Sequence, residues 1–181
     1  GKGRYRQVSF HSGTFLDEAG KPWRTQTFDW GLSVMFRDMD GDLAPELYVC
    51  NDFSAPDRVW QNLGDGRFQL MPALALRNTS RFSMGIDFAD LDRDGHDDFV
   101  VMDMLSRSHE RRMVQMGDPP QGRERGDEMT SRPQFSRNTL YRSRGDGSYA
   151  EVAYWAGTHA AEWAWAPVFV DLDLDGYEDL L

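Results

Sequence analysis

Apolar and polar residues alternate ahead of three acidic runs in the chain. In each case two apolar side chains lie two residues apart just before the first aspartate: Val34 and Phe36, Ile86 and Phe88, and Pro167 and Phe169. A period of two with one apolar face is the pattern of a β-strand that buries that face. We therefore expect a strand before each acidic run, with these apolar residues in the core.

Short apolar runs follow the acidic runs and predict a second strand: "LYV" from Leu47, "FVV" from Phe99 and "LL" from Leu180. The segments "DRVWQN" and "NTLYRS" align as a third strand, and a Gly-x-Gly turn joins each of them to "RFQLM" or "SYAEVA" as a fourth. Four short antiparallel strands per repeat are typical of a β-propeller blade. We therefore predict an all-β protein built from such four-stranded antiparallel blades.

The spacing of the motifs sets the boundaries of the units. Gly64 lies 26 residues before Asp90, and Gly145 lies 26 residues before Asp171. We interpret 1–181 as a partial β-propeller, divided into 1–28 (end of a preceding blade plus a connection), 29–72 (a blade), 83–153 (a blade with an insertion at 106–137) and 163–181 (the start of a further blade). Because a propeller closes with roughly four to eight blades, we expect further blades beyond both ends. The alternative is a self-standing arc.

Composition narrows the classes of partner. The formal net charge of −10 argues against nucleic acid and anionic membrane surfaces, which need a basic face, and favours cations. Cys50 is the only cysteine, so the chain has no internal disulfide and no cysteine-based zinc site. No run of 18 or more apolar residues predicts membrane insertion, and if the protein is secreted we expect its signal peptide to lie outside this chain. Tryptophan is expected mainly in the core, at Trp60, Trp155, Trp163 and Trp165.

The acidic runs carry oxygen ligands at the same offsets in all three copies. Positions 1, 3, 5 and 9 are occupied by Asp38, Asp40, Asp42 and Glu46; by Asp90, Asp92, Asp94 and Asp98; and by Asp171, Asp173, Asp175 and Asp179. Carboxylates that converge repel each other unless a cation lies between them, and all-oxygen donors select calcium. The position-7 carbonyls of Ala44, His96 and Tyr177 are the expected additional ligands.

These loops predict up to three Ca²⁺ sites. The site at Asp38 departs most from the pattern, because Leu43 replaces the position-6 glycine and Glu46 replaces the last aspartate. Asp97, at position 8 of the second run, falls outside the set and is expected to face solvent. An EF-hand is excluded because it needs a glutamate at position 12, where Val49 and Val101 stand here. The remaining alternative is a solvated acidic turn, which three matched copies disfavour.

Taken together, these motifs resemble known repeats. The stretches "SMGIDFADLDRDGHDDFVVMDM", "WAPVFVDLDLDGYEDLL", "DRVWQNLGDGRF" and "NTLYRSRGDGSY" resemble FG-GAP or VCBS repeats, and more narrowly bacterial VCBS-repeat proteins related to cartilage acidic protein. The resemblance implies a seven-bladed propeller similar to the integrin α head, with calcium in the loop between the first two strands of a blade. It also implies export from the cytoplasm and a role in adhesion, ligand binding or surface assembly.

The function expected from these observations is that of a binding, adhesion or scaffold module outside the cytoplasm, secreted, periplasmic or at the cell surface, with structural calcium. A protein or glycan partner is expected, and the insertion at 106–137 is either its binding surface or a solvated loop. Two alternatives stay open: a non-catalytic subunit of a larger envelope assembly, and the propeller part of a polysaccharide-acting enzyme. We expect no enzyme activity, since the chain has no Gly-x-Ser-x-Gly elbow and no paired-histidine zinc motif.

Overall fold

The computed structural model describes residues 3–24, 27, 29–53, 55–116 and 132–181. Its strands are β1 (Phe15–Leu16), β2 (Trp30–Arg37), β3 (Glu46–Asp52), β4 (Arg58–Asn62), β5 (Phe68–Leu70), β6 (Thr79–Ser80), β7 (Gly85–Ala89), β8 (Asp98–Met102), β9 (Gln134–Phe135), β10 (Thr139–Ser143), β11 (Tyr149–Glu151), β12 (Phe169–Val170) and β13 (Asp179–Leu180). The helices are a short 3-10 turn at Phe10–Ser12, α1 (His109–Met116) and α2 (Ala153–Ala156). Neither α1 nor α2 is long and apolar enough to cross a membrane.

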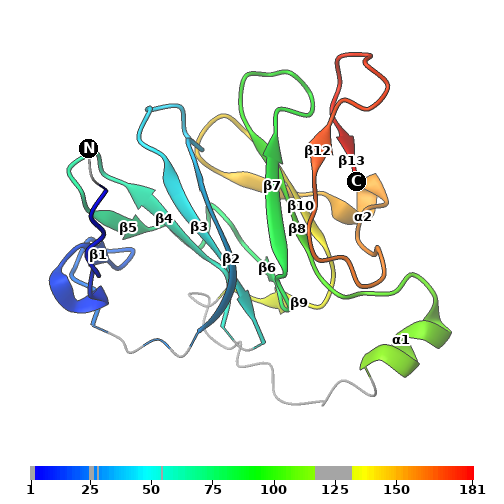
Figure 1. Cartoon of the computed structure of the whole chain (residues 1–181), viewed down its shortest axis with the longest axis horizontal. Helices are drawn as coiled ribbons and strands as arrows, with labels where there is room; N and C mark the ends of the chain where they lie inside the picture. The colour runs from blue at the N-terminus through cyan, green and yellow to red at the C-terminus, as the bar shows by residue number, and fades with distance from the viewer. Residues whose placement is uncertain (1–2, 25–26, 28, 54, 117–131) are drawn as a thin grey trace.

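Two sheets follow one another through the molecule (Figure 1). The first sheet has the strand order β1-β5-β4-β3-β2, and the second sheet has the order β11-β10-β8-β7. Neighbouring strands are antiparallel except for β1, which pairs in parallel with β5. β12 and β13 form a third, two-stranded sheet, and β6 pairs in parallel with β9. The prediction of an all-β protein with antiparallel four-stranded units is confirmed, while closure into seven blades stays a prediction.

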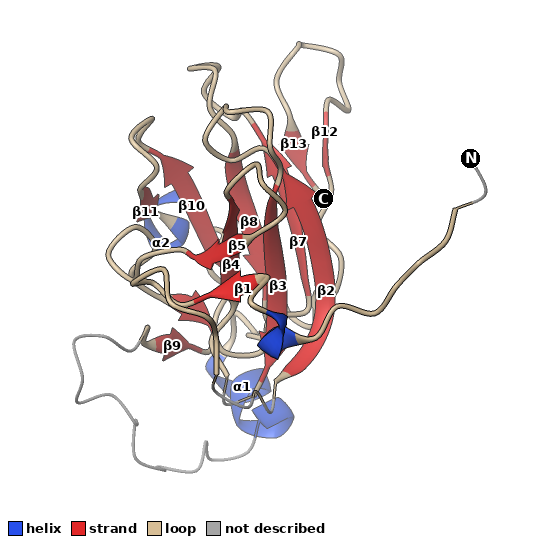
Figure 2. Cartoon of the chain, turned by 90° about the vertical axis from the view of Figure 1, so that its left-hand side faces the viewer, coloured by secondary structure: helices blue, strands red, loops and turns tan. Residues whose placement is uncertain are grey.

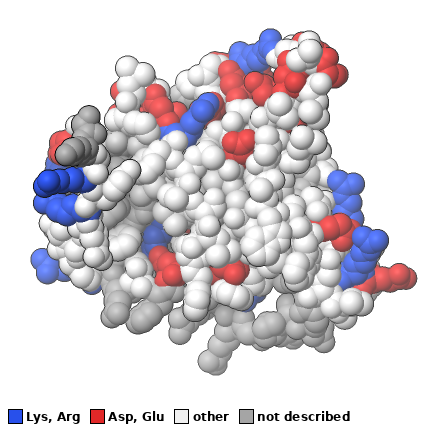
Figure 3. Space-filling model, viewed as in Figure 1, with Lys and Arg blue, Asp and Glu red and all other residues white. Residues whose placement is uncertain are grey.

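The three acidic loops lie at one end of the molecule (Figures 1 and 2). They join β2 to β3, β7 to β8 and β12 to β13, so each connects an edge strand to its neighbour in the sheet. We call them loop one (38–46), loop two (90–98) and loop three (171–179). Figure 3 shows acidic side chains gathered along this edge, with basic side chains beside some of them.

The main core lies between the first and second sheets. Phe99 is fully buried there, and its ring contacts the rings of Tyr48, Phe88, Tyr141 and Tyr149. Because successive side chains of a strand point to opposite faces, the neighbouring Val100 joins a second cluster on the other side of β8. The half-buried Phe169 and Leu180 of the third sheet pack against that cluster. The second sheet is therefore covered on both faces.

The predicted burial of Val34 and Phe36 on β2 is wrong. Ile86 and Phe88 on β7 are 4% and 7% exposed, whereas Val34 and Phe36 on β2 are 60% and 61% exposed. The alternation is present from Ser33 to Phe36, and a β-bulge between Gly31 and Ser33 interrupts it toward Trp30 and Leu32, which are also exposed. Within the described residues, nothing covers the face that Val34 and Phe36 share as the first sheet covers β7.

The expected burial of the tryptophans holds for only one of those predicted. Trp60 is 1% exposed, because Phe15 of β1 and Trp23 pack against its ring. Trp155, Trp163 and Trp165 are 88%, 51% and 58% exposed, so their placement in the core is wrong. They lie in and after α2, where the third sheet consists of β12 and β13 alone.

The predicted division of the chain stays a prediction, but the structure places parts of it. Within 1–28, Phe15–Leu16 extends the outer edge of the first sheet. Within the insertion 106–137, His109–Met116 forms α1, and the residues 117–131 lie outside the described part of the chain. Arg132 and Arg137 at its end are buried, and β9 pairs with β6. The end of the insertion is thus part of the fold rather than a surface loop.

Candidate metal centres in the acidic loops

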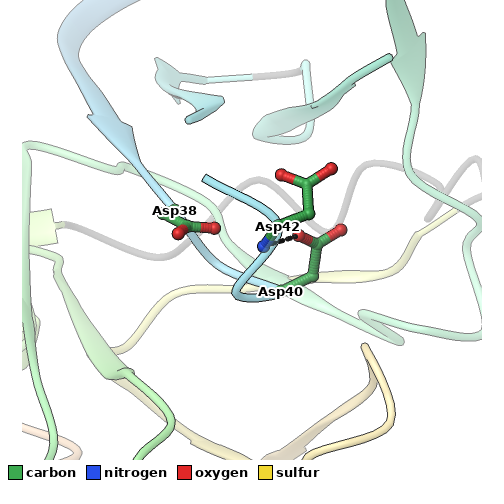
Figure 4. Close-up of side chains that lie close together, drawn as sticks. All are labelled: Asp38, Asp40 and Asp42. Atoms are coloured by element: carbon green, nitrogen blue, oxygen red, sulfur yellow. Dashed lines mark hydrogen bonds between the residues drawn. The ribbon is translucent and has the colours of Figure 1, made fainter. Parts of the chain in front are cut away.

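Each loop brings together its carboxylates of positions 1, 3 and 5. In all three triplets, one oxygen from each aspartate lies within 4.8 Å of the others: Asp38, Asp40 and Asp42; Asp90, Asp92 and Asp94; and Asp171, Asp173 and Asp175. In loop one, Asp38 at the end of β2 faces Asp40 and Asp42 across the turn (Figure 4). The predicted convergence of these residues is therefore present in the geometry.

Backbone N–H groups hold the carboxylates of position 1. The N–H of position 6 donates to this aspartate in every loop: Leu43 to Asp38 at 3.1 Å, Gly95 to Asp90 at 2.9 Å and Gly176 to Asp171 at 2.9 Å. These bonds fix the direction of the side chain before any ligand arrives. A preorganised carboxylate loses less conformational entropy on binding.

The carboxylates of position 5 are held in the same way. Asp42 accepts from the N–H of Ala44 at 2.7 Å, Asp94 from His96 at 2.9 Å and Asp175 from Tyr177 at 2.8 Å. The acceptor is one oxygen, Oδ1, in each case, so the other oxygen stays available. The three loops therefore share these two internal hydrogen bonds, which the matched offsets in the sequence alone could not show.

A known family of repeats matches the part of the chain that contains these loops. The model for the FG-GAP-like repeat matches residues 38–101 and 128–181. The chain belongs to the FG-GAP-like repeat family. No curated protein matches the chain. The FG-GAP match covers all three acidic loops, and the narrower resemblance to proteins related to cartilage acidic protein stays a prediction.

The position-9 carboxylates of the FG-GAP loops lie outside the triplets. Glu46 and Asp98 are 1% and 2% exposed. Glu46 Oε2 accepts from the N–H of Met39 at 2.7 Å, and Asp179 Oδ2 accepts from Leu172 at 3.1 Å, both at position 2 of their loops. These carboxylates tie the start of the loop to the next strand. Their predicted role as metal ligands stays a prediction, as do the carbonyls of Ala44, His96 and Tyr177.

The same carboxylates also reach the third strand of their sheet. Glu46 Oε1 accepts from the N–H of Asn62 on β4 at 3.3 Å, and Asp98 Oδ1 accepts from Ser143 on β10 at 2.8 Å. Asn62 and Ser143 occupy equivalent positions in the aligned third strands. Loops one and two are therefore each anchored to the third strand of their sheet, as well as to the two strands that they join.

Burial and mutual repulsion raise the pKa of several loop carboxyls. The pKa of Asp40 is raised by desolvation and then by the charges of Asp42 and Asp38. Desolvation also raises the pKa of Glu46 and of Asp98, with smaller contributions from the triplets beside them. A bound cation would favour the ionised carboxylates and reverse these shifts. Loops one and two are thus electrostatically unfavourable without a positive charge.

The donor set fits calcium. All the converging ligands are carboxylate oxygens, the kind of donor that calcium prefers over nitrogen or sulfur. In loop three, Asp171 Oδ1 is buried and has no hydrogen-bond partner among the described residues. A buried acceptor without a partner is costly, so a ligand at this oxygen would relieve an existing penalty.

Two positions in each loop require a left-handed backbone. At position 4, Gly41, Arg93 and Leu174 have φ of 82°, 59° and 62°; at position 6, Leu43, Gly95 and Gly176 have φ of 69°, 87° and 88°. Each loop supplies glycine at only one of the two positions. Leu43 therefore adopts the φ that glycine adopts in the other loops, and its N–H still reaches Asp38.

Charged contacts around the loops were not predicted. Asp97 pairs with Arg37 of β2 and its side chain is 15% exposed, so the expectation that it faces solvent is wrong. Asp92 pairs with Arg142 of β10. The guanidinium of Arg93 lies 4.2 Å from the centre of the Tyr177 ring in loop three. Alternation on β10 could have shown Arg142 as a surface residue, but only the fold places it at Asp92.

Proposed function

We propose that this FG-GAP protein is a calcium-stabilised binding, adhesion or scaffold module that works outside the cytoplasm. The observation that carries the proposal is the set of three aspartate triplets, each held by the same N–H donors between an edge strand and its neighbour in the sheet. FG-GAP repeats are typical of extracellular domains. Extracellular calcium is high enough to fill sites of modest affinity.

Calcium acts structurally in this proposal. Each ion would cancel the repulsion within a triplet and hold the loop that joins two strands. Because the unfolded chain lacks the converged site, binding adds directly to the free energy of unfolding. One site filled at 100 times its dissociation constant contributes about 2.7 kcal/mol, which corresponds to a melting shift of roughly 5–10 °C for a chain of this size.

Thermal melting with and without a calcium-selective chelator tests the proposal. We expect the melting temperature to fall when calcium is removed and to recover when it is added back. Asp173→Asn should reduce the calcium-dependent shift. Asp65→Asn is the matched control, because Asp65 is an exposed aspartate that pairs with Arg67 in a hairpin turn outside the loops. A melting temperature that does not change when the chelator is added would contradict the calcium proposal.

The partner of the module is proposed to be a protein or a glycan. Within the insertion, α1 presents Met113 and Val114, which are 48% and 87% exposed. A glycan array with the purified chain, run alongside an assay for glycan cleavage, separates a binding module from an enzyme. We expect binding without cleavage products. Cleavage would favour the polysaccharide-acting alternative.

A subunit role in a larger assembly is the second candidate, and one observation favours it. β2 presents Val34 and Phe36 on one face, and Trp30 and Leu32 beside the bulge that precedes them, all of them between 48% and 66% exposed. Exposed apolar patches of this kind mark interaction surfaces. Native mass measurement of the protein from its source tests the candidate, because a solitary binder would give the mass of one chain.

A further inference from the structure

Loop two differs from loop one in the charge that the third strand brings to it. Arg142 of β10 pairs through Nη2 with Oδ2 of Asp92, a member of the second aspartate triplet. The aligned third strands place Gln61 of β4 at the equivalent position in the first sheet. Both loops share the N–H bonds from positions 6 and 7, but they differ at the position-3 carboxylate. Asp40 accepts from the N–H of Asp42 at 3.2 Å, whereas Asp92 pairs with Arg142.

We propose that Arg142 is a built-in counter-ion of loop two, which competes with the divalent cation for Asp92 and thereby lowers the calcium affinity of this loop. The inference rests on the proposed function, since it concerns the affinity of a calcium site. It assigns to Arg142 the role of an affinity-determining residue. Gln61 leaves loop one without this competition.

The geometry explains why the arginine reaches the loop. The N–H groups of Asn62 and Ser143, the next residues along β4 and β10, bond to the position-9 carboxylates Glu46 and Asp98. The third strand is therefore fixed against the loop at this point in both sheets. In the second sheet the residue before that anchor is Arg142, which contacts Asp92 of the triplet.

The chemistry of arginine makes the competition persistent. A guanidinium stays charged at every physiological pH, so it cannot be switched off by titration as a histidine could. It supplies one positive charge to a triplet that would otherwise be repulsive. A calcium ion that binds the same triplet must break the Arg142–Asp92 pair and is repelled by the arginine that remains nearby.

Exposure shows that the displacement is feasible. The side chain of Arg142 is 55% exposed, and that of Asp92 is 27% exposed. Exposed ion pairs contribute little to stability, so the arginine can swing into solvent at small cost. Loop two is then held by Arg142 when calcium is scarce and by the ion when calcium is abundant.

The test is a calcium titration followed by NMR, with one glycine amide for each loop. Gly41, Gly95 and Gly176 report loops one, two and three, because their N–H groups donate to Asp38, Asp90 and Asp171. Arg142→Gln, which installs the residue of the first sheet, should tighten the midpoint at Gly95 by about tenfold at low salt, an effect that salt reduces. Gly41 should keep its midpoint.

The reciprocal variant and a charge-matched control sharpen the result. Gln61→Arg should weaken the midpoint at Gly41 by a similar factor and leave Gly95 unchanged. Arg144→Gln removes the same charge from the same hairpin, but Arg144 bonds to Tyr149 O at 2.9 Å and to no loop carboxylate among the described residues. Its effect at Gly95 should be about twofold or less.

The outcomes separate the inference from the proposed function. If all three glycines respond to calcium but Arg142→Gln leaves the Gly95 midpoint in place, the Arg142 inference is wrong and the calcium proposal stands. If Arg144→Gln shifts Gly95 as much as Arg142→Gln does, the effect is one of net charge and the inference is also wrong. If no glycine amide signal shifts in millimolar calcium, both the Arg142 inference and the proposed calcium binding are wrong.

Discussion

The first and second sheets repeat one strand plan but differ in how the same positions are covered. Ile86 and Phe88 on β7 are almost fully buried by the first sheet, whereas Val34 and Phe36 at the equivalent positions of β2 are about 60% exposed. The local sequences are alike, so local preference does not explain the difference. Alternation identifies which residues share a face, and only the neighbouring sheet decides whether that face is buried.

Replacing the two equivalent phenylalanines by alanine should give the largest difference in stability between the two sheets. Phe88→Ala should lower the free energy of unfolding by about 3–5 kcal/mol, because it removes buried ring surface and leaves a cavity. Phe36→Ala should change it by roughly 0.5 kcal/mol or less, because that ring already faces solvent. Denaturant unfolding of both variants measures the difference. Equal losses would show that the face of β2 is covered in solution.

Each sheet also has a buried pair of one aspartate and one asparagine, and the two residue types occupy opposite positions in the two sheets. In the first sheet the N–H of Asn51 donates to Asp57 Oδ1 at 2.8 Å, and in the second the N–H of Asp103 donates to Asn138 Oδ1 at 2.8 Å. In the aligned sequences, asparagine stands where the other sheet has aspartate. The geometry is kept, but the aspartate stands before the third strand in the first sheet and after the second strand in the second sheet.

The charge at Asp57 predicts a pH dependence of stability. Burial raises the pKa of Asp57 to about 7, although the N–H of Asn51 and the hydroxyls of Ser83 and Tyr48 donate to it. Between about pH 4 and pH 7 the folded state keeps a proton that the unfolded state has lost, so stability falls as pH rises through this window. The loss is on the order of 4 kcal/mol.

Asp57→Asn should flatten this part of the pH profile, because an amide has no proton to lose. The measurement is urea unfolding from pH 4 to pH 8 with saturating calcium, which holds the loop carboxylates ionised. Asp65→Asn is the control and should keep the slope, because Asp65 is exposed. A slope that survives in Asp57→Asn would assign the dependence to other carboxyls, such as Asp103, whose pKa is also raised by burial.

Position 6 of the loops gives a smaller, opposite pair of effects. Leu43→Gly should raise the free energy of unfolding by about 0.5–1 kcal/mol, because it relieves a left-handed leucine whose side chain is 88% exposed. Gly95→Ala should lower it by about 1–2 kcal/mol, because it places a Cβ at φ 87°. Thermal unfolding in calcium compares them. A Leu43→Gly variant that is less stable than the parent would mean that the leucine makes a contact worth more than the strain.

The sequence could predict those features that repeat at short range. Alternation, the Gly-x-Gly turns and the acidic offsets were enough to predict the strands and the aspartate triplets, because each depends on neighbours along the chain. The exposure of Val34 and Trp165 and the pairing of Asp97 with Arg37 could not be predicted, because each depends on a second sheet or loop. The aligned sequences show that aspartate and asparagine exchange places between the two sheets. Only the structure shows that the two residues of each pair are hydrogen-bonded.

The smallest predicted effect concerns the contact that joins the two sheets at the loop end. Arg37, just before loop one, pairs with Asp97 of loop two, and their side chains are 46% and 15% exposed. Desolvation is partial, so a double-mutant cycle with Arg37→Gln and Asp97→Asn should give a coupling of about 0.5–1 kcal/mol at low salt that shrinks as salt screens it. Unfolding of the four proteins at two salt concentrations measures it. A coupling that salt does not change would show that shape rather than charge joins β2 to loop two.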